Sequence, residues 1–186
     1  MDERAYNLEP ALRGALAGLV GERWVCLGFT GRIRGDVLTC PVEIATDRTV
    51  IAISVLDNEV ALGGDDEVIT LVADVPLEGH LEEARRAGRI AVHGAGEVVR
   101  SVHLIREELV RIRDDVPMFR VSVDSGVVIE LETVAIAIQK RGFHGFEFVL
   151  SVAPNAEQLR FHDSASEWPM DLELTCRYER VLIPCD

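Results

Sequence analysis

The sequence predicts a mainly β protein, an antiparallel β-barrel with a few short helices. Residues 37–55, VLTCPVEIATDRTVIAISV, contain two runs rich in β-branched residues that are joined by the polar turn 46–49. This is the pattern of a β-hairpin. A third apolar run, 68–73, follows closely. Strands this close in sequence favour an antiparallel meander, because parallel neighbours need a long crossover.

The segments before this hairpin add one helix and one strand. Apolar residues between Leu8 and Val20 recur at helical spacing, which predicts an amphipathic helix. The run 24–30 is typical of a strand, and it leads into turn residues at 31–36. Proline cannot donate a hydrogen bond to a sheet, so Pro41 in the next strand should mark an edge, a bulge or a point where pairing is interrupted.

The remaining segments alternate between short helices and strands. Further helical segments are expected at 56–63, where Asp57 or Asn58 can cap one turn, at 80–87, and at the charged run 106–115. Strands are expected at 89–99, broken by Gly94 and Gly96, and at 119–123, 127–138, 146–150 and 172–176. We expect a barrel domain over residues 1–142 and a β-rich C-terminal extension over residues 143–186 packed on it.

Composition limits the function. The chain has 186 residues, a formal net charge of −13 and 48% hydrophobic residues, so it can bury a core but repels nucleic acid and anionic membranes. The acidic N-terminus and the absence of a long apolar run predict a cytoplasmic protein. The cysteines and histidines lack metal-ligand spacing, and Cys26 and Cys40 are expected in the core.

Four short stretches, taken with the order of elements, suggest a family. They are 25–30 (VCLGFT), the step Pro41–Val42, 49–54 (TVIAIS) and 93–98 (HGAGEV). In these stretches the chain resembles the FMN-binding split β-barrel family related to pyridoxamine 5′-phosphate oxidase, over roughly residues 8–138. The resemblance implies an antiparallel split barrel of six or seven strands. It also implies a homodimer with FMN at the interface, where the cofactor would carry out redox chemistry on a small-molecule substrate.

The resemblance also implies where the flavin would bind. The corresponding positions are Val42, Ile44, Ile53, Ser54, Val55, Asn58 and His93. Ser54 keeps a hydroxyl where the family usually has a threonine, and Asn58 begins the predicted helical turn, whose N–H groups could bind phosphate. His93 falls on a strand that lines the neighbouring subunit's site in the family. No side chain stands out as an acid, base or nucleophile, so no catalytic residue is assigned.

The basic side chains that bind the flavin phosphate in the family are missing. The expected arginine falls near Cys40, a lysine near Ala45, and a Ser-Arg-Lys run at residues 56–58. Each lost charge-assisted hydrogen bond costs about 1.5–3 kcal/mol. Two or three losses would weaken binding by about two to six orders of magnitude, unless nearby arginines at positions 32, 34 or 48 replaced them. Two alternatives therefore stand beside a flavin oxidoreductase: a flavin-free split barrel that acts as a binding or structural dimer, and an unrelated six-stranded barrel.

Overall fold

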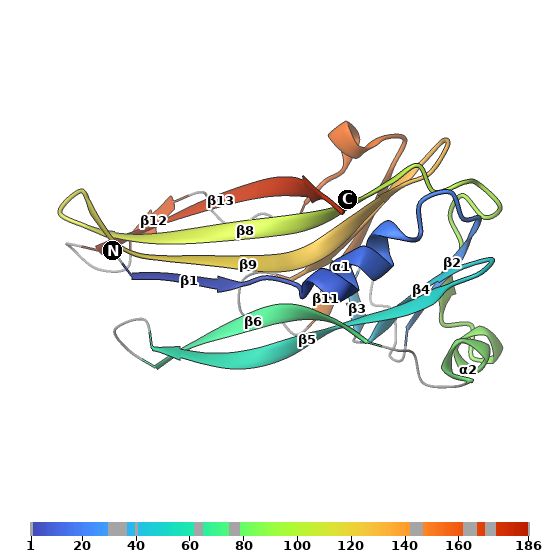
Figure 1. Ribbon diagram of the computed structural model, residues 1–186, viewed down its shortest axis with the longest axis horizontal. Coiled ribbons are helices and arrows are strands. Elements are labelled where there is room, and N and C mark those ends of the chain that lie inside the picture. Colours follow the sequence, from blue (N-terminus) through green and yellow to red (C-terminus); the bar gives the residue numbers. More distant parts are fainter. Residues whose placement is uncertain are drawn as a thin grey trace.

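The computed structural model has two β-sheets that lie one above the other, with helix α1 (Pro10–Ala17) across the front between them (Figure 1). The structure describes residues 2–29, 37–39, 41–61, 65–74, 79–141, 147–161, 167–169 and 174–185. The predicted mainly β, antiparallel fold is confirmed. The two sheets are not closed into one cylinder, which is compatible with a split barrel.

The smaller sheet contains the predicted hairpin. Its strand order is β6 (Asp65–Asp74), β5 (Val50–Ala61), β4 (Val42–Thr46), β2 (Trp24–Phe29) and β7 (Ile90–Ala91). Strands β4, β5 and β6 form the expected antiparallel meander, with Val42 opposite Ile53 and Ser54 opposite Val72. The helix predicted at 80–87 is present as α2 (His80–Arg86). It lies beside β2.

The larger sheet contains the long strands and the C-terminal ones. Its order is β12 (Glu167–Pro169), β13 (Leu174–Pro184), β8 (Ser101–Arg113), β9 (Val116–Glu130), β10 (Ala135–Lys140), β11 (Glu147–Ala153) and β3 (Val37–Thr39). Strand β1 (Asp2–Tyr6) pairs with β9 in parallel. A 3₁₀ turn, η1 (Ala156–Gln158), follows β11. The described residues after 146 therefore supply strands to the same sheet as β8 to β10.

Pro41 lies at the point where the chain changes sheets. Strand β3 ends at Thr39 and pairs with β11 of the larger sheet, whereas β4 begins at Val42 and pairs with β2 and β5 of the smaller one. The predicted interruption is confirmed, and the missing N–H of proline costs no ladder bond here. Cys40 and the turn predicted at 31–36 lie outside the described residues.

The main core fills the space between the sheets. Its members come from α1, the smaller sheet and strands β3, β8, β9, β10 and β11 of the larger sheet. They include Leu16, Leu27, Phe29, Ile44, Leu104, Ile138 and Phe148. Cys26 is also buried, in β2, as expected. None of the helices within the described part of the chain is both long and apolar enough to span a membrane.

A β-bulge interrupts the long β8–β9 hairpin. Ile105 pairs with Gly126 and Arg106 pairs with Asp124, which leaves Ser125 without a cross-strand partner. The Ser125 hydroxyl donates to the Ile105 carbonyl at 3.2 Å. Such a bulge bends the strand and increases its twist.

Asp124 binds two separate parts of the chain at this bulge. Its carboxylate accepts hydrogen bonds from Arg106 Nε at 2.8 Å, from Arg106 Nη2 at 3.2 Å and from the Leu8 N–H at 2.8 Å. Asp124 is fully buried. On the same strand, β9 changes its neighbour from β1, which pairs with 119–123, to β10, which pairs with 126–130. The carboxylate therefore fixes the junction of three strands.

Two helix predictions are wrong. The run 106–115 is strand through Arg113, because Arg106 and Glu107 find buried cross-strand partners that no local pattern reveals. Residues 56–61 continue β5, because β6 supplies a ladder partner for every residue from Ala52 to Ala61. That pairing overrides the capping preference of Asp57 and Asn58.

The strand predicted at 89–99 is shorter than expected. Strand β7 contains only Ile90 and Ala91, and residues 92–97 turn away. Gly94 and Gly96 have φ angles of 64° and 87°, which end a strand.

Gly126 packs so closely on β10 that a larger residue should be excluded. A Cβ atom at this position would lie 2.3 Å from the Ile138 carbonyl oxygen. Gly126→Ala should lower the free energy of unfolding by about 1–3 kcal/mol or more, measured by urea titration. Gly14→Ala is the control, because nothing lies within 4 Å of its added Cβ and alanine favours a helix by up to about 1 kcal/mol. Unchanged stability of Gly126→Ala would contradict the close packing.

Candidate functional site

Three of the positions expected to contact flavin are part of the main core. Val42, Ile44 and Ile53 are each 0% exposed. Val42 lies opposite Phe29 and Ile44 opposite Leu27 on β2, so these side chains face the larger sheet. Their side chains stabilise the fold and are not accessible to a ligand.

The next positions along β5 are more accessible. Ser54 and Val55 are half-buried, and they lie opposite Val72 and Leu71 of β6. Asn58 is a strand residue opposite Val68 rather than the first residue of a helical turn. The N–H groups that a helix N-terminus would have offered to a phosphate are therefore not present at Asn58.

His93 is exposed and lies at the other edge of the smaller sheet. It follows β7, and its loop is bound to β2 by the hydrogen bond from Gly96 N–H to the Trp24 carbonyl at 2.8 Å. Strands β4 and β2 separate β7 from β5. At about 4.8 Å per strand, β7, which precedes His93, lies about 14 Å from β5, which carries Ser54 and Val55, within one chain.

The arginines proposed to replace the family's basic residues do not gather at β5. Arg48 Nε lies 3.4 Å from Glu22 Oε1, in the turn between β4 and β5. The same Glu22 carboxylate accepts hydrogen bonds from Thr46 and Thr49, so this group of residues fastens the turn. The arginines at 32 and 34 lie outside the described residues. Within the described part of the chain, these residues do not fit a flavin phosphate.

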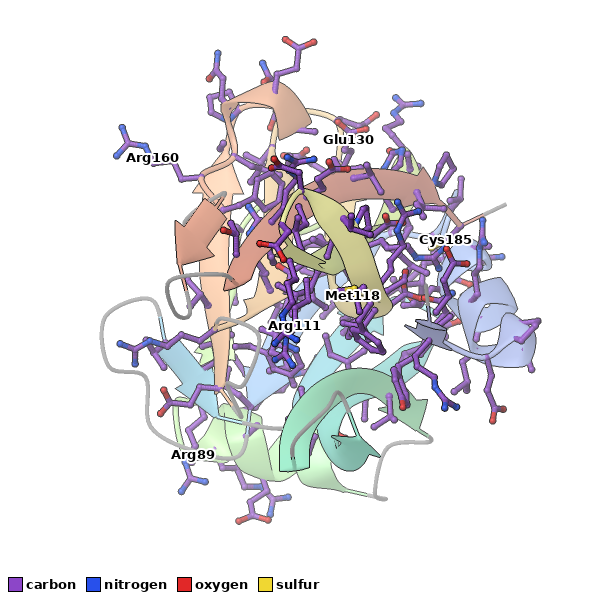
Figure 2. The ribbon with its side chains drawn as sticks, turned by 90° about the vertical axis from the view of Figure 1, so that its left-hand side faces the viewer. Arg89, Arg111, Met118, Glu130, Arg160 and Cys185 are labelled. Carbon is purple, nitrogen blue, oxygen red and sulfur yellow. The ribbon has the colours of Figure 1, made fainter. Side chains whose placement is uncertain are left out.

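Three other arginines, Arg89, Arg111 and Arg160, are also dispersed. Figure 2 shows Arg89 and Arg160 extending outward at the rim of the molecule, whereas Arg111 lies near the centre of this end view. These three side chains do not form a common anion site.

The sequence did not reveal a second group of polar residues, which is buried in the larger sheet. Glu107 on β8 is 0% exposed and accepts hydrogen bonds from Gln139 Nε2 at 2.9 Å and from Arg180 Nη2 at 3.3 Å. The Arg180 guanidinium also lies over the rings of Phe161 and Tyr178, 5.2 and 5.5 Å from their centroids. These contacts offset the cost of burying the Glu107 charge.

Lys140 is the last residue of β10, next to Gln139. It is the single lysine of the sequence and is fully buried. Burial lowers the pKa of its amine from 10.5 to about 8, and the negative charge of Glu107 opposes this shift. The signal that could have revealed this group is a lysine at the end of an apolar strand run, because charged residues are seldom fully buried.

The chemistry available to these residues is limited. Strongly perturbed lysines occur in active sites, but buried ion-pair networks perturb pKa values as well. Here Glu107 is held between Gln139 and Arg180, which is a structural arrangement. Among the described residues no three His, Cys, Asp or Glu side chains are grouped to hold a metal ion.

Comparisons with known proteins give no relative. A scan of protein-family models, a search of curated proteins and a search of solved structures each found no match. The assignment of function therefore depends on the residues themselves.

The pKa of Lys140 makes stability depend on pH. Between pH 8 and 10.5 the unfolded chain keeps a proton on this amine that the folded chain releases. The free energy of unfolding should therefore rise with pH across this window, by up to about 3 kcal/mol. Below pH 8 both states hold the proton, and the cost of burying the charge is fully present.

Lys140→Met is the control for this effect, because methionine has a similar length and no charge. The difference in stability between the wild type and Lys140→Met, from urea titrations at several pH values, should change in favour of the wild type as pH rises. Parallel pH profiles for the two proteins would contradict a lowered pKa.

Proposed function

We propose that the chain is a binding or structural protein without enzymatic activity of its own, and that it works as a homodimer. One observation carries the proposal: Val42, Ile44 and Ile53, which the flavin would contact, are fully buried in the core. A side chain that fills the space between two sheets cannot also contact a ligand.

The charges support the same proposal. Asp124 and Glu107 are buried and bind Arg106 and Arg180, which stabilises the larger sheet. The net charge of −13 opposes an anionic ligand such as a phosphate, unless cations gather locally.

Absorption and mass test this proposal together. Protein purified without added cofactor should be colourless, and it should remain so after incubation with FMN and removal of the excess. Its mass by light scattering should be twice 20.5 kDa, because the dimer is part of the proposal. A stoichiometric flavin spectrum would contradict the absence of a cofactor, and a monomer at all concentrations would contradict the dimer.

A flavin-binding oxidoreductase is the second proposal. The antiparallel meander β4–β5–β6 and the interruption at Pro41 favour it, because both agree with the resemblance to the split-barrel family. FMN would then lie at a dimer interface near Ser54 and Asn58, and a small molecule would be the substrate. Under this proposal, changing Ser54 and Asn58 together to bulky apolar residues should abolish flavin retention, and retained flavin would place the site elsewhere.

A further inference from the structure

Within the described residues, strand β13 has an edge without a strand partner on the side away from β8. Strand β12 pairs only with residues 175–177 of β13, and no described strand pairs with residues 178–184 on that side. In Figure 1 this part of β13 runs along the upper rim of the larger sheet. Exposed strand edges are templates for pairing with another chain.

The direction of the backbone groups identifies the residue that would make this pairing. The Cys185 N–H donates to the Val102 carbonyl of β8 at 3.0 Å. Because backbone groups alternate in direction along a strand, odd-numbered residues of β13 face β8 and even-numbered ones face outward. Leu182 therefore directs its N–H and C=O away from the sheet. Pro184 also faces outward, and because it lacks an N–H, a strand paired at this edge would receive no backbone hydrogen bond from it.

The side chains at this edge are apolar. Val181 is 48% exposed and Leu182 is 38% exposed, and Ile183 follows them. The adjoining Arg180 is paired with Glu107 of β8, so Glu179 is the exposed charge beside this apolar segment.

We propose that two copies of this chain pair through this edge, as antiparallel β13 strands related by a two-fold axis at Leu182. In this register Leu182 faces Leu182 of the second copy and exchanges two backbone hydrogen bonds with it. On either side of this pair, Val181 of one copy lies opposite Ile183 of the other. These two pairs exchange no hydrogen bonds, so their side chains lie closer together. The proposal rests on the homodimer proposed above and names its interface.

Charge complementarity selects a second copy as the partner. The Arg13 guanidinium of α1 donates to the Pro184 carbonyl, at the end of the open edge. The proposed register places Glu179 of one copy opposite residue 185 of the other, one residue from this carbonyl. Neither Arg13 nor Glu179 has a charged partner within the described residues. The two-fold axis would bring these opposite charges together twice.

Helix α1 and the end of β13 lie on one side of the molecule. Figure 2 shows Cys185 on the side where α1 lies. Leu12 and Leu16 of α1 share the main core with Cys185, so the helix is held at this end of the strand. Arg13 is therefore placed to meet a charge on an approaching strand.

The first test changes the apolar contact. Val181→Lys should weaken the dimer by about tenfold or more in sedimentation experiments, because it replaces an apolar contact with an edge charge. Val20→Lys is the matched control, since Val20 is 46% exposed and lies in the turn after α1. It should leave the dimer unchanged. An unchanged dimer with Val181→Lys would overturn the proposed interface.

The second test fixes the register. Leu182→Cys should form a disulfide-linked dimer on oxidation, because Cα atoms of a hydrogen-bonded pair lie about 5.5 Å apart, within disulfide range. Val152→Cys is the control, since Val152 is 37% exposed and lies on β11. A dimer that Leu182→Cys does not link would overturn the interface and leave the proposed function standing. A monomer at every concentration would overturn both.

The third test concerns the charges. Arg13→Glu and Glu179→Arg should each weaken the dimer, and the double variant should recover at least part of the loss. Recovery is a readout that a change in folding alone would not give. Additive losses would overturn the pairing of Arg13 with Glu179.

Discussion

The buried carboxylate of Asp124 joins parts of the chain that are more than a hundred residues apart. It binds the Leu8 N–H, just beyond β1, and the Arg106 guanidinium on β8. Removing one partner of such a pair leaves a buried charge unpaired, which is among the most destabilising changes in a protein. The position of β1 and the register of the β8–β9 hairpin both depend on this one group.

The bulge beside Asp124 decides which residues of β9 face the main core. Without it, odd-numbered residues along the whole strand would share one face. With it, Val127 belongs to the main core, whereas Val123 lies with Glu107 on the opposite face. One extra residue thus moves the odd-numbered side chains of this strand from one face of the sheet to the other.

The expected fold and the expected site have different outcomes in this protein. The antiparallel meander is present, but three positions of the expected flavin site, Val42, Ile44 and Ile53, are filled by core side chains. A fold can host many functions, so the site has to carry the assignment. Among the described residues, the most distinctive interior features are the charge pairs of Asp124 with Arg106 and of Glu107 with Arg180.

The sequence by itself determined the mainly β class, the hairpin β4–β5, its third strand and the helices α1 and α2, because these depend on local periodicity and turn chemistry. It also indicated the interruption at Pro41. Only the tertiary structure decided that residues 106–113 form a strand, because Asp124 and Gln139, which pair with Arg106 and Glu107, are 18 and 32 residues away. It likewise placed Asn58 in a ladder with β6 and buried Val42, Ile44 and Ile53 between two sheets. A pattern shows which side chains can be buried, but whether they line a site or fill a core depends on what packs against them.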